Sequence, residues 1–496
     1  MPPMPAAVVP TARARRRRRL AVPGRGTRHL LNRFSYGVTP QLYREARRRG
    51  GAQEWFEWQL RPRRIGNKYA DSTSRWFPAL GYSSATIAAK RDAGTLEPWD
   101  VMADFARWTL LRRIYSRRQV QEVMTEFWSN LLHVPAPSDT AWAFRISYDK
   151  VIRRHALGRF DDLLQAAIVH PAMLCYLDNA RSVARNPNEN LGRELLELHT
   201  VGRLGGYDEA DVRNSALILT GWRVDTWDGW RYYYSRKDHH VGRVTVMGFS
   251  DANRNPDGRA LTRRYLRYLA HHPATARRIA QRLAVRFVSD DPPADLVNKL
   301  TRVYLSSGTD IKAVLRALVR HPAFARSVDD KVRTPTEDLI ATYRVLGIRA
   351  RRPTGRASDL SDAILWQGEA IGQRPFAWNR PDGFPDAGDA WTSVSRMLGS
   401  WRTHKNLAGG YWPRTAIDYR EPMQLLPDLP ARFDFVVDHL SRQLLARPAS
   451  RRLIDACCAV SGIRRGERIT RNHPLVRWKL PRVVAAVLDT PAHMTR

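Results

Sequence analysis

The chain has 496 residues, of which 43% are hydrophobic, and a formal net charge of +34 at pH 7. This composition excludes a generally disordered protein, because it supplies enough apolar side chains for one large domain or for two to three ordinary ones. Only nine of the 82 basic residues are lysine. An arginine excess of this kind often reflects a GC-rich genome, and no nucleic-acid-binding motif accompanies it, so the charge alone is weak evidence for nucleic-acid binding.

The first 25 residues are rich in Pro, Ala and Arg, and we expect a disordered basic tail. Its arginine run, residues 13–19, can contact nucleic acid or anionic lipid, or can simply be a solvated arm. Residues 20–24 are too short for the apolar core of a signal peptide, and no apolar run approaches the ~18 residues of a membrane span. Cys175, Cys457 and Cys458 predict no disulfide framework. We therefore expect a cytoplasmic protein.

Helix signals begin at about residue 29. Thr39-Pro40 is typical of a helix start and Gly50-Gly51 of its end. A short helix with Trp55 and Leu60 follows. From about residue 100 to 133, apolar side chains at helical spacing predict two packed helices broken near Ser116. Further helices are predicted at 140–155, 159–169, 208–222, 259–271, 274–288, 295–306 and 311–320.

The triplet His-Pro-Ala recurs at 170–172, 272–274 and 321–323, each time between two apolar helical patterns. Histidine in a last helical turn favours the helix C-terminus, and proline favours the first turn of the next helix. We interpret the triplets as joints between repeated helical units, not as an array of catalytic histidines.

The segment from Asn188 to Gly202 combines helix signals with the densest set of reactive side chains in the chain. We predict a capped helix of about three turns, in which Asn188 is the cap and Gly202 the left-handed end. Leu191, Leu195 and Leu198 fall on one stripe of this helix. The segment is called the focal segment below.

The polar side chains of the focal segment lie on both sides of that stripe. Asn190, Glu194 and Glu197 line one flank, and His199 projects from the other. Because a straight helix cannot bring His199 to the glutamates, the segment supplies at most half of a metal site. A ladder of Glu189, Arg193 and Glu197 at i, i+4 and i+8 is also present, and such ladders usually brace a helix.

Residues 227–248 change character from helix to strand. Trp227, the aromatic run 230–234 and the alternation of Val241, Arg243, Thr245 and Met247 predict a β-hairpin with Asp238-His239-His240 at its turn. Thr334-Pro335-Thr336-Glu337 is a capping box that starts a helix to about residue 346. Residues 349–358 form a basic linker, a helix to about residue 371 follows, and the Pro- and aromatic-rich residues 372–385 predict a rigid loop before a helix at 392–407.

The predicted fold class is mainly α, a multi-helical globular array with a small β-hairpin insertion. We expect three parts: a disordered tail at 1–25, a helical domain at 26–412 with the hairpin at about 227–248, and a C-terminal helical extension at 413–496.

Four stretches together resemble one bacterial family, the domain of unknown function 1800. They are the focal segment, residues 207–222 from Tyr-Asp-Glu-Ala-Asp-Val to Leu-Thr-Gly-Trp, residues 272–293 from His-Pro-Ala-Thr-Ala to Asp-Asp-Pro-Pro, and the Trp-Asn-Arg-Pro-Asp-Gly-Phe-Pro loop at 378–385. The resemblance runs from about residue 29 to about residue 412, and its first and third blocks are quite specific. The family has no established activity, so the resemblance predicts the fold better than the function.

The resemblance also identifies departures. Members of the family often carry His-Asn-His after the Phe-Trp that is Phe127-Trp128 here, whereas this chain has Ser129-Asn130-Leu131. The family's His-Asp-x-Gly turn appears as His239-His240-Val241-Gly242, and a later lysine is replaced by Val244. If those groups form a metal or acid–base site in the family, this chain lacks two of its ligands. Relatives are often exported with a twin-arginine leader, which this chain does not show.

Three functional hypotheses follow. The first is an enzyme with Glu194 or Glu197 as general base, Arg193 or Arg243 as an anion anchor, and His239 or His240 supplied by the hairpin. The second is a non-catalytic binding or scaffold protein with a degenerate site. The third is nucleic-acid association through arginine.

The first hypothesis leaves further roles open. Asn188 and Asn190 either fix a substrate or cap the helix, and Asn130 and His199 are further binding candidates. No phosphate-binding loop, paired cysteines or His-Glu-x-x-His motif occurs, so no nucleotide or zinc cofactor is predicted. A metal remains compatible with the focal glutamates, although positions 129 and 131 are not histidine.

Overall fold

The computed structural model describes residues 19–226 and 229–496. The first 18 residues of the predicted basic tail, and Trp227 of the predicted hairpin, lie outside these described residues. The described part of the chain contains twenty-five α-helices and four small two-stranded antiparallel sheets, so the predicted mainly α class is confirmed. None of the described helices combines the length and the apolar character that crossing a bilayer requires.

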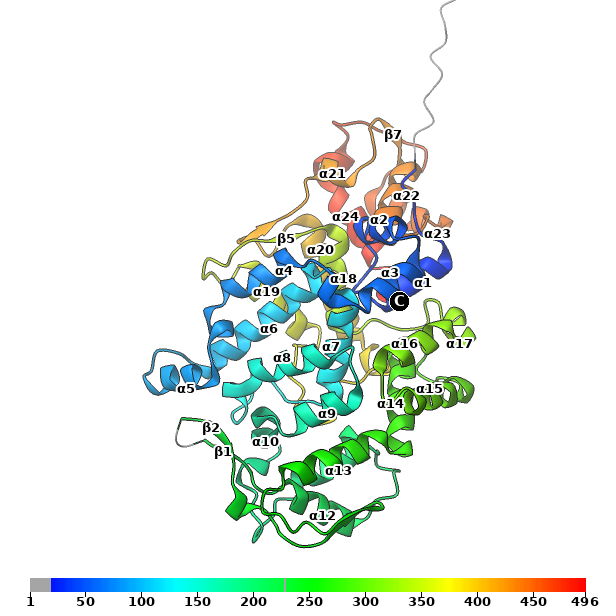
Figure 1. Cartoon of the computed structure of the whole chain (residues 1–496). Coiled ribbons are helices and arrows are strands. Elements are labelled where there is room, and N and C mark those ends of the chain that lie inside the picture. The colour runs from blue at the N-terminus through cyan, green and yellow to red at the C-terminus, as the bar shows by residue number, and fades with distance from the viewer. Residues whose placement is uncertain (1–18, 227–228) are drawn as a thin grey trace, which may run out of the picture.

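Among the helices of the first half, α3, α4 and α8 pack against α6 and α7, which lie near the middle of the molecule (Figure 1). Their bounds are α1 Arg25–Arg33, α2 Pro40–Arg48, α3 Ala52–Gln59, α4 Lys68–Ser72, α5 Ser84–Asp92, α6 Pro98–Tyr115, α7 Gln119–Leu131, α8 Arg145–His155, α9 Phe160–Ile168, α10 Pro171–Tyr176, α11 Asn190–Glu194 and α12 Glu209–Leu219.

The second half begins at one end of the molecule, where α12 and α13 lie, and places α22 and α23 toward the opposite end, while the C-terminus lies near α1 and α3 (Figure 1). The bounds are α13 Arg259–His271, α14 Pro273–Phe287, α15 Ala294–Ser306, α16 Ile311–Arg320, α17 Pro322–Arg326, α18 Pro335–Leu346, α19 Leu360–Ala370, α20 Val394–Gly409, α21 Pro422–Leu425, α22 Phe433–Leu444, α23 Arg451–Ser461, α24 Leu480–Leu488 and α25 Pro491–Met494.

Several predicted helix boundaries are confirmed by their hydrogen bonds. Thr39 caps α2 through the backbone N–H of Leu42, and α6 and α7 are separated at Ser116. At the start of α18, the Thr334 hydroxyl accepts from the Glu337 N–H while the Glu337 carboxylate accepts from the Thr334 N–H, which is a capping box.

The His-Pro-Ala triplets mark helix joints, but with a different role for histidine than predicted. His170, His272 and His321 are the N-cap residues of α10, α14 and α17, not members of the preceding last turn. In each, the ring Nδ1 accepts from the backbone N–H two residues later, at 3.2 to 3.3 Å. Because only an unprotonated ring nitrogen can accept, these caps require neutral imidazoles.

The hairpin prediction was wrong in its pairing. Strand β1 (Trp222–Asp225) pairs with β2 (Arg231–Tyr234), and β3 (Val244–Val246) pairs with β4 (Phe249–Asp251). Asp238 therefore lies between two separate hairpins and not at one turn. Two further pairs are very short: β5 (Arg349–Ala350) with β6 (Ile417–Asp418), and β7 (Ala431–Arg432) with β8 (Arg468–Ile469).

The core consists mainly of apolar side chains, but it also contains a buried network of ion pairs. Arg286 of α14, which is 1% exposed, contacts carboxylates of Glu126, Glu337 and Asp386 at 2.9, 2.9 and 3.4 Å. Glu122 of α7 is held by Arg112 at 3.0 Å and by Arg153 at 2.6 Å. Part of the arginine excess is therefore internal, where the planar guanidinium pairs with carboxylates from several helices.

Candidate functional site

The focal segment folds as a short α-helix that continues as a π-helical turn. Helix α11 runs from Asn190 to Glu194, and the π-turn η6 from Leu195 to His199. The predicted single regular helix from Asn188 was wrong in this respect. Gly202 ends the segment as predicted, with φ +88° and its N–H bonded to the Leu196 carbonyl at 2.9 Å. Single π-turns within helices are frequently found at functional sites.

The π-turn changes where His199 lies. The extra residue in the turn places His199 fully inside, and its Nδ1 is 2.9 Å from the Leu131 carbonyl at the end of α7. A backbone carbonyl can only accept, so Nδ1 carries the proton. Burial lowers the pKa of His199 to about 4, so the ring is neutral. Nε2 has no hydrogen-bond partner among the described residues.

The Trp378–Pro385 loop closes the same region from the other side. Gly383, with φ +70°, lies so close to α7 that a Cβ there would be 2.1 Å from the Asn130 carbonyl oxygen. His133 Nε2 is 2.8 Å from the Trp378 carbonyl. Three separate stretches, the end of α7, the focal segment and this loop, thus meet in one junction, which is called the α7 junction below.

Glu194 is the carboxylate of the α7 junction that the fold leaves without a counter-ion. It is half-buried and forms no ion pair with any residue that the structure describes. Burial, together with the charges of Glu197 and Asp382, raises the pKa of Glu194 above its ordinary value, although Arg203 and Arg193 oppose this. Such a carboxylate exchanges protons closer to neutral pH than an ordinary glutamate.

Three further groups of the junction carry chemistry. Tyr176, the last residue of α10, has its pKa raised to about 12 by burial and by the charges of Glu194 and Asp382. Its ring lies edge-on to His133 at 6.4 Å. Burial lowers the pKa of His133 to about 4. Asp382 accepts from Trp378 Nε1 at 2.7 Å and from Arg380 at 2.6 Å, so its carboxylate is fixed in the loop.

Glu197 and Arg193 are both engaged by neighbours. Arg193 makes a two-pronged pair with Glu209 at 2.7 and 2.8 Å and contacts Glu189 at 3.5 Å. Glu197 lies 3.5 Å from Arg203 and 4.0 Å from Arg193. The contacts of Arg193 with Glu189 and Glu197 are those of the predicted ladder, whereas its shortest contacts, with Glu209, join the segment to α12.

The focal asparagines make local contacts. Asn188 Oδ1 accepts from the Asn190 N–H at 2.9 Å, although the residue before the first helical one is Glu189, which makes no side-chain cap. Asn190 Nδ2 lies 3.5 Å from Asp178. Asn130 is buried, with 8% of its surface exposed, directly behind Gly383.

The histidines of the hairpin region lie at the end of α12. His239 is buried, with Nδ1 at 3.0 Å from the Thr220 carbonyl and Nε2 at 3.1 Å from Asn253 Oδ1. His240 is held through its backbone by Thr220 and Asn253. Arg243 is exposed, and the structure gives it no polar contact with a described residue. The contacts that position His239 and His240 therefore belong to the hairpins and α12, and not to the α7 junction.

A cavity of about 610 Å³ adjoins the loop of the α7 junction. Trp378 and Phe384, whose rings lie 5.2 Å apart, line it together with Asn379, Arg380 and Arg374. Cavities of this size accommodate small organic ligands. Arg380 also lies over the Trp378 ring at 5.5 Å, a cation–π arrangement.

Sequence reasoning did not identify His133, Tyr176 and Asp382 as site residues. The one signal for any of them concerns His133, which lies two residues beyond position 131, where the resemblance led us to expect a histidine.

A second group of side chains was also not predicted. Asp338, His404 and His493 lie buried together at the joint of α18, α20 and α25, with one ligand atom of each within 4.8 Å of the others. Nothing in the local sequence links these three residues.

The fold and the α7 junction define a class of protein: a large, mainly α-helical chain in which a π-turned segment, the end of one helix and an aromatic loop meet around carboxylates and neutral imidazoles. The chain belongs to the family described as protein of unknown function (DUF1800), whose model matches residues 29–495. The resemblance stated from four sequence blocks is thereby confirmed, and it continues past residue 412 to the last helix. Comparison with curated proteins and with solved structures gives no match.

Proposed function

We propose that the protein is an enzyme in which Glu194 transfers a proton to or from a small organic molecule bound against the Trp378–Pro385 loop. The observation that carries the proposal is Glu194 itself, a half-buried carboxylate that forms no ion pair with a described residue, although the chain has a net charge of +34. General acids and bases work best when their pKa lies near the operating pH, and burial beside like charge moves a carboxyl in that direction.

The neighbouring groups have complementary roles in this proposal. Tyr176, with its pKa raised to about 12, stays protonated and can donate a hydrogen bond to substrate oxygen. Asp382, fixed by Trp378 and Arg380, supports the raised pKa of Glu194 through its charge. The aromatic wall of the 610 Å³ cavity fits an apolar or aromatic portion of the substrate. His239 and His240, named in the sequence hypothesis, have no role in this version.

A first test requires no knowledge of the substrate. Carbodiimide-activated amine coupling reacts with protonated carboxyls, so mass spectrometry of the coupled protein as a function of pH gives the titration of Glu194. We expect coupling at Glu194 to persist to higher pH than the ordinary pKa of a glutamate would allow. In Glu197→Gln the Glu194 profile should move to lower pH, because one of the charges that raise its pKa is gone. An unchanged profile in that variant contradicts the electrostatic basis of the proposal.

A second test concerns turnover. A library of small aromatic and aliphatic acids, esters and ketones is screened for compounds that raise the melting temperature, and each hit is followed by NMR for chemical change. Glu194→Gln should bind the hits but lose turnover by about 100-fold or more, the usual contribution of general acid–base catalysis. The matched control is Glu209→Gln, which removes an exposed carboxylate that pairs with Arg193 of the same segment. This variant should keep the turnover of the parent. Equal turnover by Glu194→Gln and the parent would sink the proposal.

A different observation favours a second function, binding of an anionic ligand. A cleft of about 1130 Å³ is lined by Arg44, Arg344 and Arg420, none of which forms an ion pair with a described carboxylate. Partial burial, together with the charge of Arg44, lowers the pKa of Arg420. Neighbouring cations without counter-ions favour binding of a phosphate or carboxylate group.

This binding function is testable with a polyanion. Heparin oligosaccharides and short single-stranded oligonucleotides should bind more weakly as salt rises, because bound counter-ions are released on association. The double variant Arg44→Ala, Arg420→Ala should weaken binding at least 10-fold. The control double variant Arg302→Ala, Arg320→Ala, which removes two exposed arginines that do not line the cleft, should lose far less. Equal loss in both would mean that overall charge, and not the cleft, binds the polyanion.

A further inference from the structure

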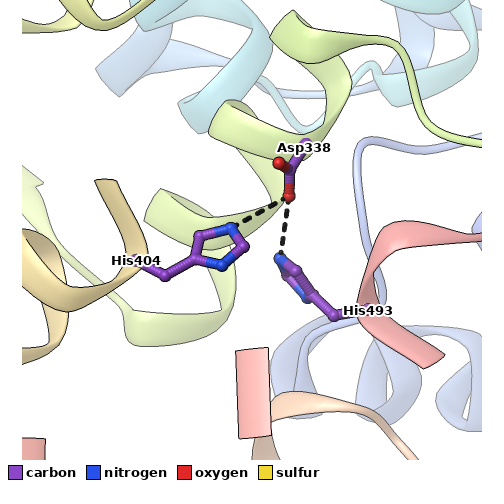
Figure 2. A group of neighbouring side chains, drawn as sticks. All are labelled: Asp338, His404 and His493. Carbon is purple, nitrogen blue, oxygen red and sulfur yellow. Dashed lines mark hydrogen bonds and ion pairs between the residues drawn. The ribbon is translucent and has the colours of Figure 1, made fainter. Parts of the chain in front are cut away.

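Three helices that are far apart in the sequence place one ligand-bearing side chain each at a single buried point. Asp338 comes from α18, His404 from α20 and His493 from α25, and their exposed fractions are 1, 1 and 3%. Figure 2 shows both imidazoles directed at the same oxygen of the Asp338 carboxylate. His404 Nε2 is 3.1 Å and His493 Nε2 3.4 Å from that oxygen, Oδ1.

We propose that Asp338, His404 and His493 bind one Zn²⁺ ion. Two nitrogens and one carboxylate oxygen form a donor set that zinc accepts, with bonds of about 2.0 to 2.2 Å. Donor atoms bound to the same tetrahedral ion are then about 3.3 to 3.6 Å apart. Two of the three donor pairs already have separations of 3.1 and 3.4 Å, and all three lie within 4.8 Å. Small side-chain rotations would complete the set.

The surroundings orient these donors. Asp489 Oδ1 lies 2.8 Å from His404 Nδ1, so that ring can donate from Nδ1 to Asp489 while Nε2 faces the centre of the group. This carboxylate–histidine–metal order is the usual support for a zinc-bound imidazole. The other Asp338 oxygen lies 3.6 Å from Arg396, which leaves Oδ1 for the ion. The two imidazole rings are nearly perpendicular, at 82°, and Figure 2 shows that they reach the carboxylate from different sides.

Room for a further ligand lies beside His493. A cavity of about 20 Å³, lined by His493, Arg333 and Asn32, is large enough for one water molecule. Besides such a water, the Thr342 hydroxyl is a nearby oxygen that could serve as a ligand, since its Oγ1 lies 2.9 Å from His493 Nε2. Because Asp489 follows α24 and His493 lies in α25, an ion at this point would join the C-terminal helices to α18 and α20. The inference is independent of the chemistry at Glu194.

The experiment begins with protein stripped of metal by a chelator. Zn²⁺ is titrated in competition with a chromogenic chelator, and the stoichiometry is checked by elemental analysis. We expect one Zn²⁺ per chain, a rise in melting temperature on addition of Zn²⁺, and an X-ray absorption spectrum with two imidazole ligands at about 2.0 Å. His404→Ala and His493→Ala should each lower affinity at least 100-fold, and Asp489→Asn, which removes only the orienting carboxylate, 10- to 100-fold.

A matched control lies in the same C-terminal region. His473 and Glu467 form a half-buried pair at 3.0 Å that has no third metal-binding side chain among the described residues, so His473→Ala should leave zinc affinity unchanged. If the histidine variants do not fold, Asp489→Asn and the spectrum of the parent decide the question. Absence of stoichiometric zinc in the folded parent would overturn the proposal and leave the group as a buried ion-pair network. Undiminished binding in the folded double variant His404→Ala, His493→Ala would overturn it too.

Discussion

Glu122 of α7 and Glu194 of α11 are two helical glutamates that the fold withdraws from water, yet their pKa values move in opposite directions. Burial alone raises the pKa of both. At Glu122 the charges of Arg112 and Arg153 more than offset burial and lower the pKa to about 2. At Glu194 the charge of Glu197 adds to burial. The fold therefore pairs the charge of Glu122, which holds helices together, with two arginines, and it leaves Glu194 of the α7 junction without an ion-pair partner among the described residues.

The largest expected effect on stability is at Glu122, whose charge is paired with two arginines. Glu122→Gln removes the charge that holds Arg112 and Arg153, and we expect a loss of about 3 kcal/mol in the free energy of unfolding at pH 7, measured by urea denaturation. Since the folded pKa is depressed, this contribution is present above the unfolded pKa of about 4.5 and is lost as pH falls toward 2. If Glu194→Gln costs as much, the two glutamates do not differ as described.

A smaller loss in the free energy of unfolding is expected when a side chain is added at Gly383, where the loop contacts α7. Gly383→Ala places a methyl group against the Asn130 carbonyl and also strains a positive φ, for a cost of about 2 to 3 kcal/mol. Gly372→Ala is the control, because Gly372 also has a positive φ of +94° but no atom within 4 Å of its Cβ position. Equal losses in the two variants would show that the contact with α7 contributes nothing.

A hydrogen bond between uncharged groups, the His272 N-cap of α14, gives a reference for the stability changes expected at the two glutamates. His272→Ala removes the N-cap of α14, with an expected cost of about 1 kcal/mol in thermal or chemical denaturation. His272→Asn should restore most of it, because an amide oxygen can accept the same N–H. Failure of asparagine to rescue would mean that the ring contributes through packing and not through its hydrogen bond.

The smallest effect is expected at Glu194. Glu194→Gln should change the free energy of unfolding at pH 7 by less than about 0.5 kcal/mol, and in the stabilising direction, because it removes a charge that lacks a partner. Since the folded pKa is raised, the stability of the parent relative to this variant should fall as pH rises above the unfolded pKa of about 4.5. A relative stability that rises with pH would contradict the direction of the shift.

Local sequence signals predicted those parts of the fold that local hydrogen bonds determine. The capping box at Thr334, the N-cap at Thr39 and the break at Ser116 depend on residues within a few positions of one another. The hairpin pairing failed because alternating side chains identify strands but not their partners. The triplet histidines were placed at the correct joints but on the wrong side of them, since the ring bonds forward to the next helix.

The candidate site was predictable only in part. The focal segment was recognised from its own residues, whereas His133, Tyr176 and Asp382 reach it from stretches that long-range packing alone brings near. The same limit applies to Asp338, His404 and His493, which span 155 positions and share no local motif. Helix propensity also does not distinguish an α-turn from a π-turn, so the inward position of His199 was beyond sequence reasoning.

The π-turn between Leu195 and His199 limits which insertions and deletions the chain can tolerate. Because a π-turn already holds one residue more than the α-turn it replaces, a further insertion there could not be absorbed in the same way, and it would rotate the residues that follow by about 100° relative to those before it. His199 would leave the Leu131 carbonyl, and Gly202 would no longer end the segment in its left-handed conformation. The number of residues from Glu194 to Gly202 is therefore as constrained as their identity, although the segment has the composition of an ordinary leucine-rich helix.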